Sequence, residues 1–150
     1  MLKDVLTENL IDLNVRAETW QEAIAAAGTL LVKASIVKQE YVQAMIETVE
    51  KLGPYVVIAP GIAVPHARPE DGALKSGISL VRLSAPVVFG HSTNDPVKLV
   101  IALAAVDDSS HIKALAQLTS LLDDEHALSV LRETSSREEV MELIKRYSAE

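Results

Sequence analysis

Four histidines carry most of the reactive chemistry that this sequence offers, because the chain contains no cysteine. They are His66, His91, His111 and His126. Near neutral pH an imidazole can act as a nucleophile, carry a proton or bind a metal. The lack of cysteine removes disulfides, thiolate metal sites and a cysteine nucleophile. These imidazoles are therefore the first candidates for the chemistry of the protein.

His66 has the most informative setting of the four. It follows a short apolar stretch at 61–64 and Pro65, and it precedes a polar, turn-rich loop at 67–77. Proline fixes the backbone φ angle near about −65°, so the imidazole is held at a strand end yet open to a partner. Arg68 could pair with phosphate oxygens. Position alone leaves open the alternative that His66 is a loop residue without a chemical role.

His111 is predicted at the start of a helix whose cap is Ser109 or Ser110, directly after an apolar strand at 97–106. The ends of such strands build sites in open α/β sheets. Free N–H groups and the positive end of a helix N-terminus favour a phosphate. One imidazole could thus hydrogen-bond a phosphate carried by the other, His66. The alternative is that His111 lies in the first turn of the helix without a chemical role.

The remaining polar residues are predicted to be ordinary surface. His91 lies in the polar turn 90–96, His126 lies near a helix start, and Glu70 and Asp71 belong to a solvated loop. No HxH or HExxH spacing supports a metal site. The chain has no P-loop, dinucleotide fingerprint or nucleophile elbow. The sequence therefore predicts no metal, no cofactor and no nucleotide.

The composition indicates one soluble domain over residues 1–150. The chain is 49% hydrophobic, which suffices for a packed core, and its net charge is −7 at pH 7. An acidic chain has no electrostatic reason to bind nucleic acid or an anionic membrane, and a basic protein partner suits it better. No stretch has the length of a signal peptide core or a membrane span. We therefore expect a cytoplasmic protein that is not embedded in a membrane.

The pattern of apolar residues predicts helices at both ends of the chain and strands in the middle. Capping boxes are expected at Thr19 with Glu22 and at Ser135 with Glu138. Strands are predicted at 10–15, 55–59, 62–64, 78–83, 87–89 and 97–106, and helices at 20–31, 38–52, 112–122, 125–132 and 138–147. The nearly unbroken apolar run at 97–106 predicts a central strand covered on both faces. The fold class is therefore α/β, a single domain with a mixed β-sheet sandwiched between α-helices.

Residues 61–67, GIAVPHA, resemble the active-site signature of enzyme IIA of the bacterial phosphoenolpyruvate-dependent sugar phosphotransferase system, mannitol/fructose type. The resemblance extends over nearly the whole chain. Further landmarks of this family lie at 40–45, 110–112 and 118–125. Within the family the chain is most similar to the ascorbate-specific subgroup, on the segments 53–61, 68–72, 94–97 and 104–107.

This resemblance implies the mannitol/fructose-type IIA fold and a phosphotransferase activity without a cofactor. The phosphocarrier protein HPr would donate a phosphoryl group to His66, and His111 and helix-terminal N–H groups would stabilise it. A IIB component would then accept the group on a cysteine, and the membrane component IIC would import the sugar. Mannitol-type members carry an arginine on the second helix, but residues 46–50 contain none. Arg68 is the available substitute, and Ser110 is a second supporting candidate.

Two other functions are compatible with the same motif. A regulatory IIA protein of the nitrogen-related kind, which controls other proteins through its phosphorylation state, would share His66. A non-catalytic binding module could keep the fold without the transfer. The ascorbate-like segments favour transport over regulation, and the presence of both His66 and His111 argues against a module that has lost its chemistry.

Overall fold

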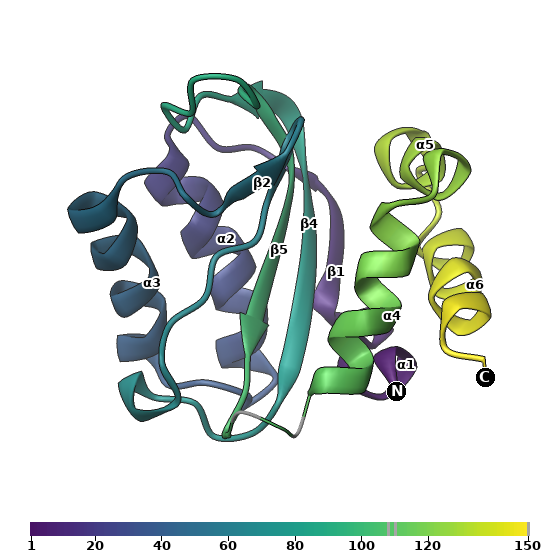
Figure 1. Cartoon of the computed structure of the whole chain (residues 1–150), viewed down its shortest axis with the longest axis horizontal. Helices are drawn as coiled ribbons and strands as arrows, with labels where there is room; N and C mark the ends of the chain where they lie inside the picture. Colours follow the sequence, from purple (N-terminus) through teal and green to yellow (C-terminus); the bar gives the residue numbers. More distant parts are fainter. Residues whose placement is uncertain (108, 110, 150) are drawn as a thin grey trace.

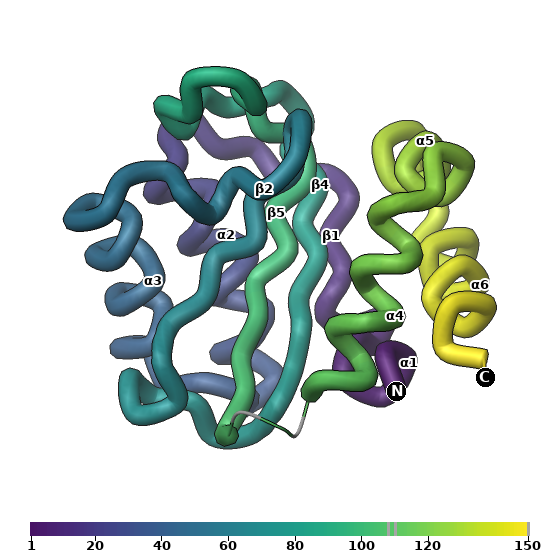
Figure 2. The backbone as a smooth tube through the Cα atoms, in the orientation of Figure 1, coloured from purple at the N-terminus to yellow at the C-terminus, as the bar shows by residue number. Residues whose placement is uncertain are grey.

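The computed structural model describes residues 1–107, 109 and 111–149. In that part of the chain a five-stranded sheet has the strand order β1-β4-β5-β3-β2 (Figures 1 and 2). The strands are β1 (Ile11–Val15), β2 (Val57–Ala59), β3 (Ile62–Ala63), β4 (Gly77–Val87) and β5 (Val97–Ala104). The helices are α1 (Leu2–Val5), α2 (Trp20–Lys33), α3 (Gln39–Leu52), α4 (Ile112–Leu122), α5 (Glu125–Glu133) and α6 (Arg137–Tyr147), and η1 (Glu8–Leu10) and η2 (Pro69–Asp71) are 3-10 turns.

Strand directions decide where the functional residues meet. β5 lies between β4, which is antiparallel to it, and β3, which is parallel to it. The carboxyl ends of β3 and β5 therefore lie at the same edge of the sheet. His66 comes after the end of β3 and His111 after the end of β5, so both predicted residues lie just beyond this edge of the sheet. This finding confirms the expectation that 97–106 is a central strand, although β5 ends at Ala104.

Helices cover both faces of the sheet, as predicted. Figure 1 shows α2 and α3 on one face, and α1, α4, α5 and α6 on the other. Each face has its own cluster of buried apolar side chains. The two helices on the first face approach closely at Gly28, where an added Cβ would lie 2.6 Å from a Val42 methyl. No helix in the described residues is long and apolar enough to cross a membrane.

Several local predictions were wrong. The strand expected at 78–83 continues through Pro86 to Val87 as the single strand β4, and residues 88 and 89 of the second expected strand lie outside it. Proline is tolerated there because residues 84–86 are exposed and fall where the register with β5 shifts, so a missing N–H costs no ladder bond. The short helix α1 was not predicted, because four residues carry too little periodicity.

Two helix caps also differ from expectation. Ser136, rather than Ser135, caps α6 and accepts the Glu139 N–H, so the expected box is displaced by one residue. His111 itself occupies the N-cap position of α4, and the Ser109 N–H instead donates to Asp107. The Thr19 cap of α2 is confirmed, since its hydroxyl accepts the Glu22 N–H over 3.2 Å.

Candidate functional site

The backbone at His66 continues the direction of β3 and still pairs with β5. His66 forms an isolated parallel bridge with Leu103, and the Leu103 N–H donates to the Pro65 carbonyl oxygen over 3.0 Å. One residue earlier, the Val64 N–H donates to the Val56 carbonyl over 2.8 Å. The histidine is exposed although Val64 and Pro65 before it are buried. A rigid, buried backbone thus presents an open side chain.

A backbone hydrogen bond fixes the tautomer of the His66 ring. Nδ1 lies 3.0 Å from the Val64 carbonyl oxygen. A carbonyl oxygen only accepts hydrogen bonds, so in the neutral ring Nδ1 carries the proton and Nε2 keeps its lone pair. The Tyr55 ring packs edge-on against the imidazole, with 6.0 Å between the ring centroids. These contacts orient the ring and make Nε2 the nucleophilic nitrogen.

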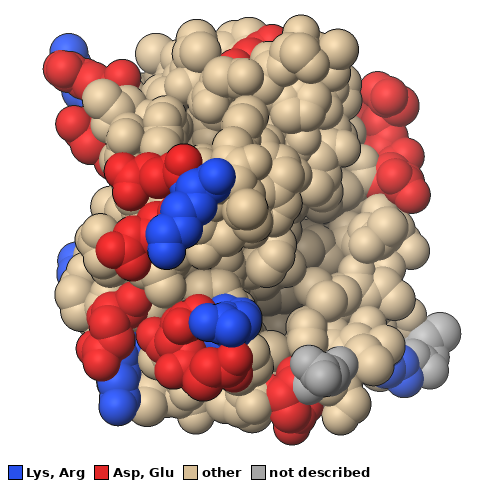
Figure 3. Space-filling model, turned by 60° about the vertical axis from the view of Figure 1, so that its left-hand side comes forward, with Lys and Arg blue, Asp and Glu red and all other residues tan. Residues whose placement is uncertain are grey.

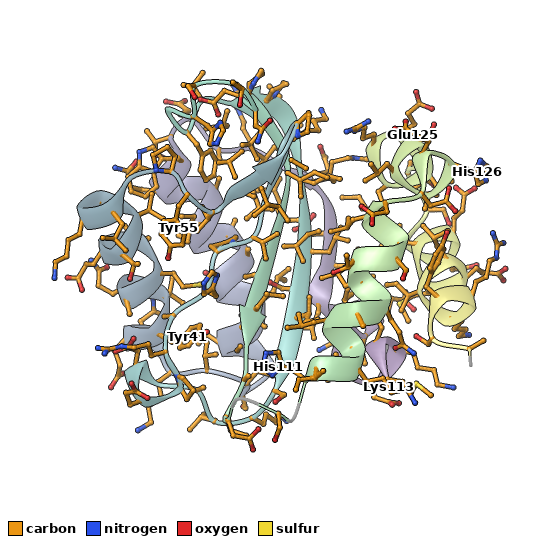
Figure 4. The ribbon with its side chains drawn as sticks, viewed as in Figure 1. Tyr41, Tyr55, His111, Lys113, Glu125 and His126 are labelled. Carbon is orange, nitrogen blue, oxygen red and sulfur yellow. The ribbon has the colours of Figure 1, made fainter. Side chains whose placement is uncertain are left out.

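His111 lies at the start of α4, near the end of β5 (Figure 4). Its side chain makes no capping hydrogen bond. Its Nδ1 atom is buried and has no hydrogen-bond partner among the described residues. A buried polar atom without a partner costs free energy unless a ligand completes it. The unpaired nitrogen is therefore a candidate contact for a polar ligand.

One pocket brings the two histidines together. It has a volume of about 280 Å³, and both His66 and His111 line it. The other residues of its wall are mostly small or apolar, with Asp107 as the acidic exception: Tyr41, Ala67, Pro69, Leu103, Ala104, Ala105, Asp107 and Leu115. The pocket is bounded by the ends of β3 and β5 and by the first turn of α4. It can hold a small polar group against both imidazoles.

Arg68 faces a second pocket, on the other side of His66. This pocket, of about 430 Å³, is lined by His66 and Arg68 together with residues of α3, including Thr48 and Lys51. The side chain of Arg68 is 78% exposed, and its Nε lies 3.6 Å from Glu70 and 3.7 Å from Asp71. The structure therefore brings Arg68 near His66 but not into the pocket shared with His111.

Sequence reasoning missed three side chains of the site. Lys51, Tyr55 and Tyr41 line the two pockets that flank His66. The apolar periodicity of residues 38–52 predicted a helix, but not that the Tyr41 hydroxyl would reach the loop after His66. Lys51 directly follows the segment 46–50 and offers a cation on the helix where no arginine occurs. A count of charges near the end of that helix could have singled it out.

The other predicted residues lie elsewhere. His91 is half-buried, and its Nδ1 accepts the backbone N–H groups of Thr93 and Asn94, so it shapes its own turn. His126 is exposed in the first turn of α5. Ser110 lies outside the described residues. Among the described residues, no group of three or more acidic or histidine side chains could hold a metal ion.

Charges around the site are mainly negative. Figure 3 shows acidic side chains gathered on the side of α3 and η2, with several basic ones among them, beside a largely uncharged and hollowed surface. Glu40, Glu47 and Glu50 are exposed on α3, and Glu70 is exposed on η2. This surface suits a positively charged partner better than a free anion.

Comparisons with known proteins give this geometry a family. A sequence model of the phosphoenolpyruvate-dependent sugar phosphotransferase system, EIIA 2, matches residues 4–147. The chain belongs to this enzyme IIA family. The ascorbate-specific PTS system EIIA component of Escherichia coli is 47% identical over 150 residues, covering 99% of this chain and 97% of that protein. As a member of the family the protein is a phosphotransferase component of this system and carries a phosphoryl group.

Solved enzyme IIA structures share the fold. The mannitol-specific cryptic phosphotransferase enzyme IIA CmtB from Escherichia coli superposes with a TM-score of 0.86 at 40% identity, covering 97% of this chain and 98% of that one. Enzyme IIAMtl in its complex with phosphorylated enzyme IIBMtl, also from Escherichia coli, has a TM-score of 0.81 at 38% identity, covering 95% and 99%. The predicted family and fold are thereby confirmed.

Proposed function

We propose that His66 accepts a phosphoryl group from phosphorylated HPr through Nε2 and passes it to a IIB component in the cytoplasm. This transfer serves the uptake of an ascorbate-type sugar through a IIC permease. One observation carries the proposal. His66, with Nε2 left free by the bond from Nδ1 to Val64, shares a pocket with a buried and unpaired His111 nitrogen. The histidine that supplies the nucleophile and a second histidine with an unpaired ring nitrogen thus line the same small space.

The transfer needs no group outside the two proteins. The Nε2 lone pair of His66 attacks the phosphorus of the donor phosphohistidine, and the P–N bond of the donor breaks as the new P–Nε2 bond forms. The donor imidazole keeps the electron pair of the broken bond. The proton on Nδ1 of His66 stays on that nitrogen, hydrogen-bonded to the Val64 carbonyl, throughout. The reverse sequence, with the IIB nucleophile attacking, returns His66 to its neutral form.

His111 and the start of α4 would stabilise the transferring group. Phosphoryl transfer depends mainly on positioning and on stabilising charge on the phosphoryl oxygens. The positive dipole end of this eleven-residue helix favours such oxygens, and the His111 imidazole nitrogen adds a further donor when protonated. Ser110 precedes the same turn and could donate a hydroxyl. Arg68 and Lys51 would act from the second pocket.

The surface around His66 fits transient protein partners. Leu52, Tyr55 and Ile112 are exposed apolar side chains beside the two imidazoles, and the acidic residues of α3 lie next to them. Apolar contacts at the centre with charges outside favour docking of a basic partner such as a donor phosphocarrier. The ascorbate assignment rests on the 47% identity to the ascorbate-specific component, which also favours transport over a regulatory role.

The proposal is tested by phosphorylating the protein with phosphoenolpyruvate, enzyme I and HPr, followed by phosphopeptide mapping. We expect one acid-labile phosphate, on the peptide that contains His66, and none on a His66→Ala variant. His91→Ala serves as the matched control, since His91 lies in a turn at the other end of β5 and should not affect the label. A label on another residue, or none on the native protein, would refute the assignment. Transfer of the label to the ascorbate IIB protein, compared with a mannitol IIB protein, tests the acceptor.

A further inference from the structure

The hydroxyl of Tyr41 lies between β5 and the segment that follows His66. Tyr41 belongs to α3 and is only 1% exposed. Its oxygen accepts the N–H of Ala67 over 3.1 Å, and its proton can reach the Leu103 carbonyl over 2.7 Å or the Ala67 carbonyl over 3.1 Å. One proton serves one acceptor at a time, and the shorter contact is the one to Leu103.

This hydroxyl reinforces the end of the parallel ladder. Since His66 bridges Leu103 and the Leu103 N–H donates to Pro65, the next ladder bond would run from the Ala67 N–H to the Leu103 carbonyl. At the same place the phenolic oxygen accepts the Ala67 N–H, and its O–H donates a hydrogen bond to the Leu103 carbonyl. The hydroxyl therefore links Ala67 to Leu103 directly after His66. The pocket shared with His111 is lined by these same residues.

We propose that Tyr41 is a positioning residue for phosphoryl transfer, and that its hydroxyl fixes the peptide units on the far side of His66. The inference rests on the proposed role of His66. The backbone before the histidine is held by the bond from Val64 to Val56, and the backbone after it by the bond from Ala67 to Tyr41. The ring bonds to the Val64 carbonyl inside this same segment. Both anchors thus set the direction of Nε2.

The hydroxyl is suited to a fixed structural task. Burial raises the pKa of Tyr41, and the nearby Asp71 carboxylate raises it further, against the opposing effect of the Ala67 bond. The phenol consequently stays neutral over the working pH range and can donate and accept at the same time. It does not touch a reacting atom, since its partners are backbone groups.

A Tyr41→Phe variant tests this role. Phenylalanine fills nearly the same space, so the fold should persist, but the Ala67 N–H and the Leu103 carbonyl lose their link. We expect the maximal rate of transfer from phosphorylated HPr to fall about 10-fold, because small displacements of a nucleophile cost on this order. The KM for the donor should change by less than about twofold, because the docking surface is intact. Nitrogen-15 NMR of the histidines should show His66 losing its preference for the Nδ1–H tautomer.

Tyr147→Phe is the matched control, because it removes a tyrosine hydroxyl that bonds to Asp124, on the opposite face of the sheet. This variant should keep the native rate and the native His66 signal. Normal rate and tautomer in Tyr41→Phe would overturn the proposal. So would a loss of rate that merely follows the fraction of unfolded protein in a thermal melt.

The unaltered protein gives a second measurement. If the hydroxyl holds Ala67, that amide should exchange with solvent roughly 100-fold or more slowly than an unprotected amide. Rapid exchange would overturn the inference even if Tyr41→Phe failed to fold. The proposed function fails in a different way, through phosphate that remains on a His66→Ala variant. The two failures are therefore distinguishable.

Discussion

Replacing His111 by alanine should separate catalysis from stability. Its imidazole makes no capping bond, and its Nδ1 has no partner among the described residues, so folding gains little from it. We expect the free energy of unfolding to stay within about 0.5 kcal/mol of the native value. A hydrogen bond to a charged phosphoryl oxygen contributes about 1.5–3 kcal/mol. A loss of about 2 kcal/mol in the transition state slows transfer about 30-fold.

The assay is rapid-quench measurement of phosphoryl transfer in both directions, from phosphorylated HPr to the protein and from the phosphorylated protein to IIB. Urea unfolding of the same samples gives stability. His126→Ala is the control, because this exposed histidine lies on α5, away from the pocket. Normal rates in both directions for the His111 variant would refute the role assigned to it. A large loss of stability would show instead that the imidazole supports the fold.

Three further predictions concern other parts of the molecule. Arg68→Ala should slow transfer by less than about threefold, measured in the same assay, because its exposed guanidinium already faces Glu70 and Asp71 and exposed pairs contribute little. Gly28→Ala should destabilise the protein by about 1 kcal/mol in urea unfolding, since the clash with Val42 outweighs the better helix propensity, and adding Val42→Ala should cost less than the two single changes together. The hydrogen bond from Tyr147, together with the N–H groups of His126 and Ala127, lowers the pKa of Asp124 below its ordinary 3.8. The contribution of the ionised Asp124 carboxylate to the free energy of unfolding is therefore complete above pH 3.8 and is lost as the pH falls through the lower pKa of the folded state. The native protein should accordingly lose its stability advantage over Asp124→Asn only at pH values below 3.8.

The parts of the fold that could be predicted were those with long, regular patterns. The helical spacing of Ala23, Ile24, Ala27 and Leu31 identified α2, and the apolar run of β5 identified the centre of the sheet. What failed depends on neighbours distant in sequence. Whether Pro86 ends a strand is decided by the register shift against β5, which no local pattern reveals.

The site shows the same division. The setting of His66 after a short strand and a proline was visible in the sequence, and so was a helix start near residue 111. That the two side chains share a pocket follows only from the parallel pairing of β3 with β5. The Tyr41 hydroxyl could not be foreseen, because a tyrosine at an apolar helix position reads as core packing until its polar partners are known.

The distribution of the site over the chain also explains why its chemistry can be exposed and still be well oriented. The nucleophile and its partner are 45 positions apart in sequence, as their numbers His66 and His111 show, and the sheet joins them. The hydrogen bonds that orient the nucleophile act on the backbone at Val64 and Ala67 and on Nδ1 of the ring, whereas Nε2 makes no hydrogen bond within the described residues. A carrier must offer its nitrogen to two different proteins in turn, so the ring cannot be enclosed by its own side chains. Orientation through the backbone meets both the need for orientation and the need for access, because it holds the imidazole at Nδ1 and leaves Nε2 open to a partner protein.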